Sequence, residues 1–267
     1  MTNTKVSITN DAIVIPDTGK LDVPIVPAKR PETITNSKDN INEILELQSI
    51  VYNSLNDNEK DFLLPKSKEK ILAHFAKGNL VQGYIEDGKL VAQSFITNPS
   101  LEYPETGMVD MQDQGSIEEG ITVLQGLIVH PDYQGQGLSS KMIHNWIKFS
   151  AQQGKQVALA EVEVTNYKSY GGFLHAGLEI DSIGIDQSDG CEVFNIKGNP
   201  AKALLKQAFN FVAPKIESDT VVIPAQDVKS IKQAFNNNYK ATYWDKYSKQ
   251  LVFEKKFKPS IAMQMVM

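Results

Sequence analysis

The first part of the chain alternates between helical and strand-like hydrophobic patterns. Apolar residues recur at helical spacing over 41–50 and again in the segment after Ser67, which is a suitable N-cap. Two apolar runs of strand length then flank the pair Asp87-Gly88, a strong signal for a two-residue hairpin turn. With a short strand over 32–35, the pattern predicts a strand, two helices and a β-hairpin.

The middle of the chain continues with strands and helices in alternation. Apolar runs predict strands over 121–129, 157–164 and 191–196. A helical pattern covers 137–153, and a shorter one runs through Phe173 and ends near the next glycine. This region therefore reads strand, helix, strand, helix, strand.

The two ends of the chain differ from this core. Residues 1–31 carry three prolines and short apolar patches, and we interpret them as an N-terminal arm. Residues 199–267 read as a small α+β extension, with one helix that begins at Pro200 and another that Asp227 caps. The predicted division is thus an arm, a central domain over 32–198 and a C-terminal extension.

Composition excludes several classes of protein. The chain has 267 residues, a formal net charge of −5 and no block rich in lysine or arginine, so we expect no nucleic-acid partner. No apolar run approaches the roughly 18 residues of a membrane span. Its one cysteine, Cys191, fits a reducing, cytoplasmic compartment, and we expect it in a core strand. The histidines and Cys191 show no metal-ligand spacing, so we expect no metal.

A glycine-rich loop between the strand over 121–129 and the next helix is the most informative feature. The loop runs from Gln134 to Gly137 and leaves backbone N–H groups free at a helix N-terminus, where the helix dipole also favours anions. One interpretation is a dinucleotide fingerprint, since Gly135-x-Gly137-x-x-Ser140 approximates G-x-G-x-x-G. Four residues separate the strand from the loop, however, and an antiparallel hairpin precedes it, which disfavours that interpretation.

A different resemblance fits the loop better. The stretch Gln134-x-x-Gly137-x-Ser139, after a strand that ends Val129-x-Pro131, resembles the acyl-CoA loop of the GNAT acetyltransferase superfamily. Ser139 stands where that family usually has glycine or alanine. A second segment agrees, because Asn166, Phe173 and Gly177 reproduce the family's spacing on its last core helix. The resemblance covers residues 32–196.

The resemblance implies an α+β fold with three layers. Its sheet would be mixed and mostly antiparallel, with the fourth and fifth strands splayed apart, and acetyl-CoA would lie in that gap as co-substrate. Backbone N–H groups of the loop would hold the pyrophosphate. The implied cofactor-binding residues are Leu127, Ile128, Val129, Gln134, Gly135, Gln136, Gly137, Leu138, Ser139, Asn166 and Phe173.

The same resemblance leaves the acid–base groups open. The family's usual glutamate base falls at Gln125, which cannot accept a proton usefully. Candidate replacements are Glu161, Glu163, Glu118 and Glu119, or these acids are merely solvated. The family's thiolate-protonating tyrosine falls at Phe173. Tyr170 could serve instead, with solvent as a further candidate, or Tyr170 is a surface aromatic.

The implied function is transfer of an acetyl group from acetyl-CoA to a primary amine, by direct attack in a ternary complex. The alternative is an acyl-CoA-binding sensor or structural module that does not turn over. Acidic residues before and after the strand over 121–129 favour a small cationic amine or a peptide amine as acceptor. The members of this acidic stretch are Glu102, Glu105, Asp110, Asp113, Glu118, Glu119 and Asp132. The C-terminal extension either caps the acceptor cleft or makes a homodimer contact, and the sequence leaves both open.

Overall fold

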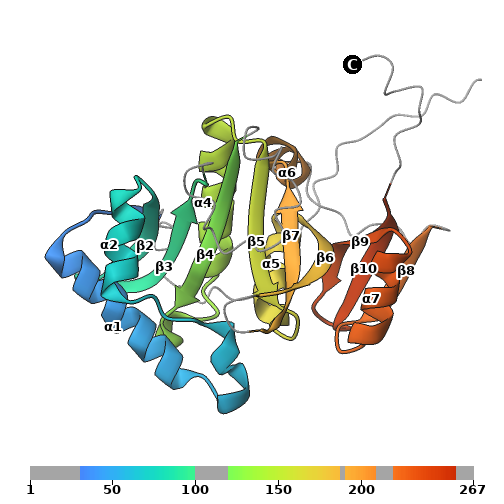
Figure 1. Cartoon of the computed structure of the whole chain (residues 1–267), viewed down its shortest axis with the longest axis horizontal. Helices are drawn as coiled ribbons and strands as arrows, with labels where there is room; N and C mark the ends of the chain where they lie inside the picture. Colours follow the sequence, from blue (N-terminus) through green and yellow to red (C-terminus); the bar gives the residue numbers. More distant parts are fainter. Residues whose placement is uncertain (1–30, 100–119, 187–189, 209–218, 257–267) are drawn as a thin grey trace, which may run out of the picture.

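A single sheet organises the computed structural model, which describes residues 31–99, 120–186, 190–208 and 219–256. Within these residues ten strands lie in the order β1-β2-β3-β4-β5-β7-β6-β9-β10-β8 (Figure 1). Adjacent strands are antiparallel except β4 and β5, which are parallel. The strands are β1 Glu32–Ile34, β2 Leu80–Glu86, β3 Lys89–Thr97, β4 Ile121–Val129, β5 Val157–Glu163, β6 Glu179–Ile185, β7 Glu192–Gly198, β8 Thr220–Pro224, β9 Tyr239–Asp245 and β10 Gln250–Lys255.

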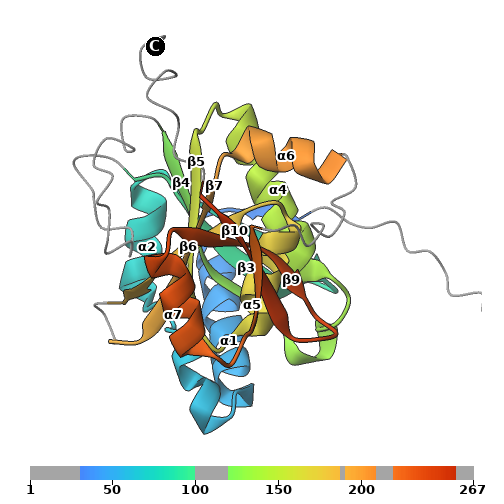
Figure 2. The ribbon, with the colours of Figure 1, turned by 90° about the vertical axis from the view of Figure 1, so that its right-hand side faces the viewer.

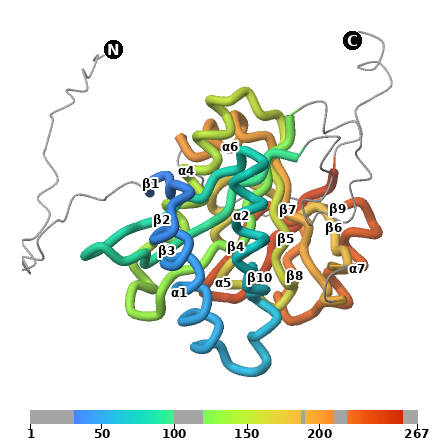
Figure 3. Tube along the Cα trace, turned by 60° about the vertical axis from the view of Figure 1, so that its left-hand side comes forward, coloured from blue at the N-terminus to red at the C-terminus, as the bar shows by residue number. Residues whose placement is uncertain are grey.

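Helices cover both faces of the sheet. The α-helices are α1 Lys38–Ser54, α2 Lys68–Ala76, α4 Leu138–Gln152, α5 Tyr167–His175, α6 Pro200–Ala208 and α7 Val228–Asn236, and the 3-10 helices are η1 Asp57–Phe62 and η2 Pro131–Tyr133. One apolar core lies between the sheet and α1 and α2, around Ile44 and Phe95. A larger core lies on the other face against α4 and α5, around Trp146. Figure 3 shows the backbone of α1 and α2 in front of the strands. The predicted mixed, mostly antiparallel α+β fold with three layers is confirmed.

Local sequence signals account for most of these elements. The Ser67 side chain caps α2 by accepting a hydrogen bond from the N–H of Lys70, and Asp227 caps α7 in the same way. Asp87 and Gly88 both have positive φ, as a two-residue turn between β2 and β3 requires. Strand β6 has no counterpart in the sequence predictions, because its buried and half-buried positions alternate too weakly to read.

The C-terminal strands continue the sheet of the core. β9 pairs with β6 through Ala241 and Ile180, and β10 and β8 follow β9 (Figure 2). Ion pairs strengthen this junction, since the Glu179 carboxylate lies 2.9 Å from Lys206 Nζ and 2.8 Å from Lys240 Nζ. The extension is therefore packed against the core, while residues 1–30, 100–119 and 257–267 lie outside the described part.

Candidate acyl-CoA site

The two parallel strands separate along their length. Within the described sheet, β4 and β5 pair from Ile121 with Val157 to Val123 with Leu159. Beyond Val123, β4 stays paired with β3 as far as Val129, and β5 stays paired with β7. The facing edges of β4 and β5 therefore diverge toward their carboxyl ends.

A bulge in β4 accompanies this divergence. The register between β3 and β4 shifts so that Gly126 and Leu127 together oppose one residue of β3. Gly126 has a φ of +54°, and a Cβ atom built on it would lie 2.9 Å from the Phe95 ring. Both the backbone conformation and the close contact require glycine here. A glycine bulge bends a strand and increases its twist, which turns the end of β4 away from its partner.

The glycine-rich loop after β4 forms a cradle at the open end of this gap. Gly135 and Gly137 have φ of +78° and +74°, and a Cβ atom on either would meet nothing within 4 Å. Gly137 is the N-cap of α4 and makes no side-chain hydrogen bond, and the first turn of α4 carries no acidic residue. The first N–H groups of a helix lack intrahelical partners. The cradle thus fits a phosphate group in both space and electrostatics.

The gap and the cradle belong to one large cleft of about 1530 Å³. Its walls come from β4, the loop and α4 on one side and from β5 and α5 on the other. Parts of η1 and of the connection from η1 to α2 line it as well, as does the turn between β9 and β10.

Most of the predicted cofactor residues line this cleft. They are Leu127, Ile128, Val129, Gln134, Gly135, Gly137, Leu138, Ser139, Asn166 and Phe173, whereas Gln136 does not line it. The N–H of Gln134 already donates to the Pro131 carbonyl at 3.2 Å, and its side chain donates to the Val129 carbonyl at 3.3 Å. The donors available to a phosphate therefore begin at Gly135, one residue later than the sequence predicts.

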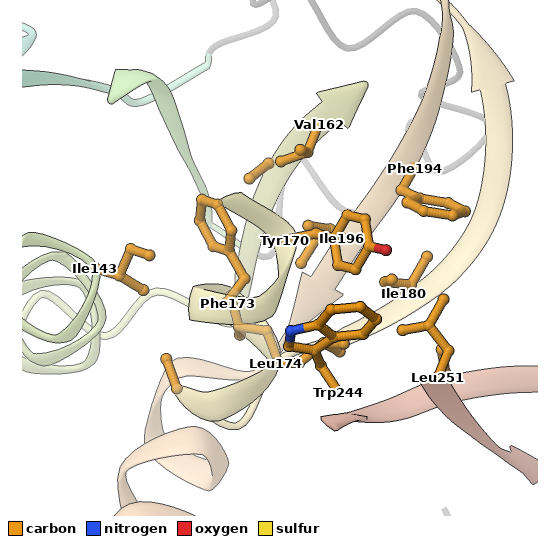
Figure 4. Close-up of a cluster of buried hydrophobic side chains, with 14 of the residues drawn as sticks. Ile143, Val162, Tyr170, Phe173, Leu174, Ile180, Phe194, Ile196, Trp244 and Leu251 are labelled. Atoms are coloured by element: carbon orange, nitrogen blue, oxygen red, sulfur yellow. The ribbon is translucent and has the colours of Figure 1, made fainter. Parts of the chain in front are cut away.

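Asn166 and Phe173 contribute structure as well as surface. The Asn166 oxygen accepts a hydrogen bond from the N–H of Ser169 at 3.2 Å and so caps α5. Phe173 is 2% exposed and packs edge-on against Trp146. Figure 4 shows its ring on the side of α5 that faces Ile143 and Val162. Phe173 therefore forms an apolar wall where the resemblance expects a proton donor.

The two predicted carboxylates on β5 both reach the cleft. Glu161 and Glu163 alternate with buried residues along the strand, so they lie on the face away from α4 and α5. One oxygen of Glu163 accepts hydrogen bonds from the N–H and the hydroxyl of Thr165, at 2.7 and 2.6 Å. Glu163 thus stabilises the turn into α5. Glu118 and Glu119 lie outside the described residues.

Tyr170 lies in the core and not on the surface. It has no exposed area, and its ring packs edge-on against Phe194 and Trp244 at 5.2 and 5.5 Å (Figure 4). Burial, together with the nearby Tyr167 and Glu163, raises the pKa of its hydroxyl. The surface-aromatic interpretation is therefore wrong, and Tyr170 is not among the cleft residues, so as a proton donor it stays a prediction without geometric support.

Sequence reasoning missed a lysine that reaches the cleft from the other wall. Lys66 precedes α2, and its Nζ donates to the side-chain oxygen of Gln125 at 3.2 Å. It also lies over the Phe95 ring, 5.4 Å from the centroid. Burial lowers the pKa of Lys66, and the positive charge of Lys70 lowers it further. A contact between residues so far apart in the chain leaves no local signal in the sequence.

The extension also reaches the cleft. Trp244, Lys246 and Lys249 line it beside the start of α5. Cys191 lines it too and is only partly buried, just before β7, so the expectation of a core cysteine is wrong. No pattern in the sequence connects these residues with the glycine-rich loop.

Strands β4 and β5 thus part beside the uncapped start of α4, and both line one cleft. The model of the acetyltransferase (GNAT) family matches residues 44–177. The match spans half of the chain, which therefore belongs to the GNAT acetyltransferase family. Acetyl-CoA is the acetyl donor of this family, and the cradle at Gly135–Ser139 fits its pyrophosphate. No curated protein matches the chain in sequence.

Solved structures with similar folds include several acetyltransferases. A ribosomal-protein-alanine N-acetyltransferase from Brucella melitensis has 12% identity and a TM-score of 0.46, over 64% of this chain and 99% of that chain. An N-acetyltransferase from Staphylococcus aureus has 10% identity and a TM-score of 0.48, over 64% and 99%. An aminoglycoside N(6′)acetyltransferase from Legionella pneumophila has 17% identity and a TM-score of 0.46, over 66% and 96%. None of these likenesses identifies an acceptor for this chain.

Two further features are absent from the part of the chain that the structure describes. None of the helices there has the length and apolar character needed to cross a membrane. Nor do the described histidine, cysteine, aspartate and glutamate side chains form a group that could hold a metal ion.

Proposed function

We propose that the protein transfers the acetyl group of acetyl-CoA to a primary amine, which attacks the thioester directly while both substrates are bound. The observation that carries the proposal is that the gap between β4 and β5 opens at the uncapped start of α4. A pyrophosphate in the cradle would direct the rest of an acyl-CoA into that gap. The edges there are not hydrogen-bonded to each other beyond Val123, so backbone groups are available to polarise a carbonyl.

Each wall of the cleft has a separate task in this proposal. Backbone N–H groups from Gly135 to Ser139 bind the pyrophosphate, and the β4 edge from Leu127 to Val129 orients the acyl arm. The carboxylates of Glu161 and Glu163 attract the acceptor and are candidate proton acceptors. Phe173 excludes water from the thioester, and the thiolate leaves as a tolerable leaving group near neutral pH.

Initial-rate kinetics test this proposal. Thiol release is measured while acetyl-CoA and each member of a panel of primary amines are varied. Direct attack predicts intersecting double-reciprocal lines, whereas an acyl-enzyme intermediate gives parallel lines. Cys191 is the one cysteine of the chain and lines the cleft, so Cys191→Ser is the matched control and should keep the wild-type rate.

The alternative function is an acyl-CoA-binding sensor. It is favoured by Gln125 and Phe173, which occupy the two positions where the family usually has its acid–base groups. Calorimetry together with the thiol-release assay separates the two functions, because a sensor binds acetyl-CoA tightly and releases no thiol with any amine.

The acceptor we propose is a small cationic amine or a peptide amine. Five carboxylates line the described cleft, Glu59, Asp61, Glu161, Glu163 and Asp186, whereas most of the acidic stretch in the sequence lies outside the described residues. Attraction of this kind weakens as salt screens it. Acceptor KM should therefore rise with ionic strength. A salt-independent KM contradicts a cationic acceptor. The cytoplasmic location, the homodimer and the domain division at residue 198 stay predictions.

A further inference from the structure

We propose that Lys66, and not Glu161 or Glu163, is the proton acceptor for the incoming amine, in place of the glutamate that the family usually carries at Gln125. This inference rests on the proposed function, because it assigns a residue to the same reaction. It follows from the position of Lys66 at the closed end of the gap between β4 and β5.

The Lys66 backbone is held in place from α1. The Gln48 side chain, 3% exposed, accepts from the N–H of Lys66 at 2.8 Å and donates to its carbonyl at 3.2 Å. Two hydrogen bonds from one buried amide fix the start of the Lys66 side chain. The side chain therefore extends over β3 and β4 from a rigid base instead of sampling solvent.

The Lys66 ammonium group lies where the two strands part. Its Nζ is 3.2 Å from the Gln125 oxygen and 5.4 Å from the Phe95 ring centroid. Gln125 follows Leu124, the first residue of β4 beyond the pairing with β5. An acyl chain that enters from the cradle after Val129 and runs along β4 has its reactive end at this point. Lys66 is thus within reach of the attacking nitrogen.

The surroundings of Lys66 favour loss of its proton. Its neighbours are Lys70 and His74 on α2, Gln48 on α1, Phe95 on β3 and Gln125 on β4. Elsewhere along the cleft lie the carboxylates Glu59, Asp61, Glu161, Glu163 and Asp186 and the basic groups Lys168, His175, Lys246 and Lys249. Burial lowers the pKa of Lys66 and Lys70 lowers it further. A cationic acceptor beside Lys66 adds a second positive charge. Two neighbouring ammonium groups repel each other, which favours release of one proton.

The proton balance of the step is simple. Neutral Lys66 takes one proton from the acceptor ammonium, and the free amine attacks the thioester carbonyl. The carbon–sulfur bond breaks, the sulfur leaves with the electron pair, and the second amine proton ends on the thiol. Lys66 then releases its proton to solvent, so the products are an amide, free CoA and one proton.

Two substitutions separate this role from a structural one. Lys66→Met keeps the length of the side chain and removes the base, while Lys66→Arg keeps the charge over Phe95 but cannot be deprotonated. Both should lower kcat/KM for the amine by about 100-fold and leave acetyl-CoA affinity unchanged by calorimetry. Wild-type kcat/KM should rise with pH as Lys66 loses its proton, and both variants should lose that ionisation. Lys68→Met is the matched control, since Lys68 is exposed on the same segment.

A measurement without substrate gives a second criterion. Competitive labelling of lysines by an acylating reagent, followed by mass spectrometry, should modify Lys66 at lower pH than Lys68. Retained activity in Lys66→Arg, or labelling of both lysines over the same pH range, overturns the proposal while the proposed function stands. Absence of thiol release by the wild type with every amine overturns the proposed function instead. Partial rescue of Lys66→Met by Gln125→Glu supports the assignment of this position to the base, and no rescue counts against it.

Discussion

The proposed cofactor site and the proposed acid–base site differ in composition. The proposed cofactor site, here called the cofactor wall, consists mainly of backbone groups in one short segment, the end of β4, the loop and the start of α4. The proposed acid–base site, here called the acid–base wall, consists of side chains from distant segments, Lys66 before α2, Gln125 on β4 and Phe173 on α5. A backbone site tolerates changes of side chain but not of backbone conformation, whereas a side-chain site responds to each functional group separately.

The strongest test of this comparison changes the backbone of the cofactor wall. Gly137→Val places a branched side chain at a φ of +74° at the first turn of α4. Such a residue strains the left-handed conformation and covers the cradle. We expect acetyl-CoA to bind about 100-fold more weakly, a loss of about 2.8 kcal/mol, by calorimetry.

A matched glycine controls for strain alone. Gly154 has a φ of +69°, has open space around it and lies after the other end of α4. Gly154→Val should cost similar stability and leave acetyl-CoA affinity unchanged. Equal losses of affinity in both variants would show that the effect is general destabilisation and not loss of the cradle.

The second test adds a functional group to the acid–base wall. Phe173→Tyr puts a hydroxyl where the family usually has its proton donor, so thiolate departure should become easier. We expect kcat for thiol release to rise about tenfold with acetyl-CoA affinity unchanged, a modest share of what a positioned acid can supply.

Tyr170→Phe is the companion variant. The Tyr170 hydroxyl is buried and has no hydrogen-bond partner in the described structure. Removing it should leave kcat unchanged and stability equal or slightly higher, because an unsatisfied buried group costs free energy. A large loss of kcat in Tyr170→Phe would restore the prediction that Tyr170 protonates the thiolate.

The same contrast explains what the sequence could predict. The strand over 121–129, the loop and the helix after it lie within one segment, and their turn chemistry and helical period are local. The sequence could therefore predict most residues that line the proposed cofactor site. The exceptions are Gln136, which does not line the cleft, and the Gln134 N–H, which donates to the Pro131 carbonyl. Lys66 meets Gln125 because the connection between η1 and α2 passes close to β4, and no local sequence pattern predicts that approach. Trp244 reaches α5 for the same reason, through a strand that joins the sheet late in the chain.

The smallest expected effect is the pH dependence of stability at the junction that Glu179 forms with Lys206 and Lys240. Burial alone would raise the pKa of Glu179, but hydrogen bonds from Lys240 and Lys206 outweigh it, and the pKa is lowered. A carboxylate with a lowered pKa in the folded state contributes stability that is complete above its unfolded pKa and is lost as pH falls through the folded pKa. The loss therefore lies below pH 4.5, the ordinary pKa of glutamate.

Glu179→Gln should lower the melting temperature by about 2–4 °C near neutral pH, for a cost of about 1 kcal/mol in a partly exposed ion pair. The difference from the wild type should shrink as the pH falls below 4.5, because protonation then weakens the wild-type pairs as well. Thermal unfolding at a series of pH values measures both. Because this loss is confined to acid, ionisations seen at higher pH in the kinetics do not come from failure of the junction between β6, α6 and β9. A difference in melting temperature that grew as the pH fell would contradict a lowered pKa of Glu179. The junction could then no longer be excluded as a source of ionisations in the kinetics.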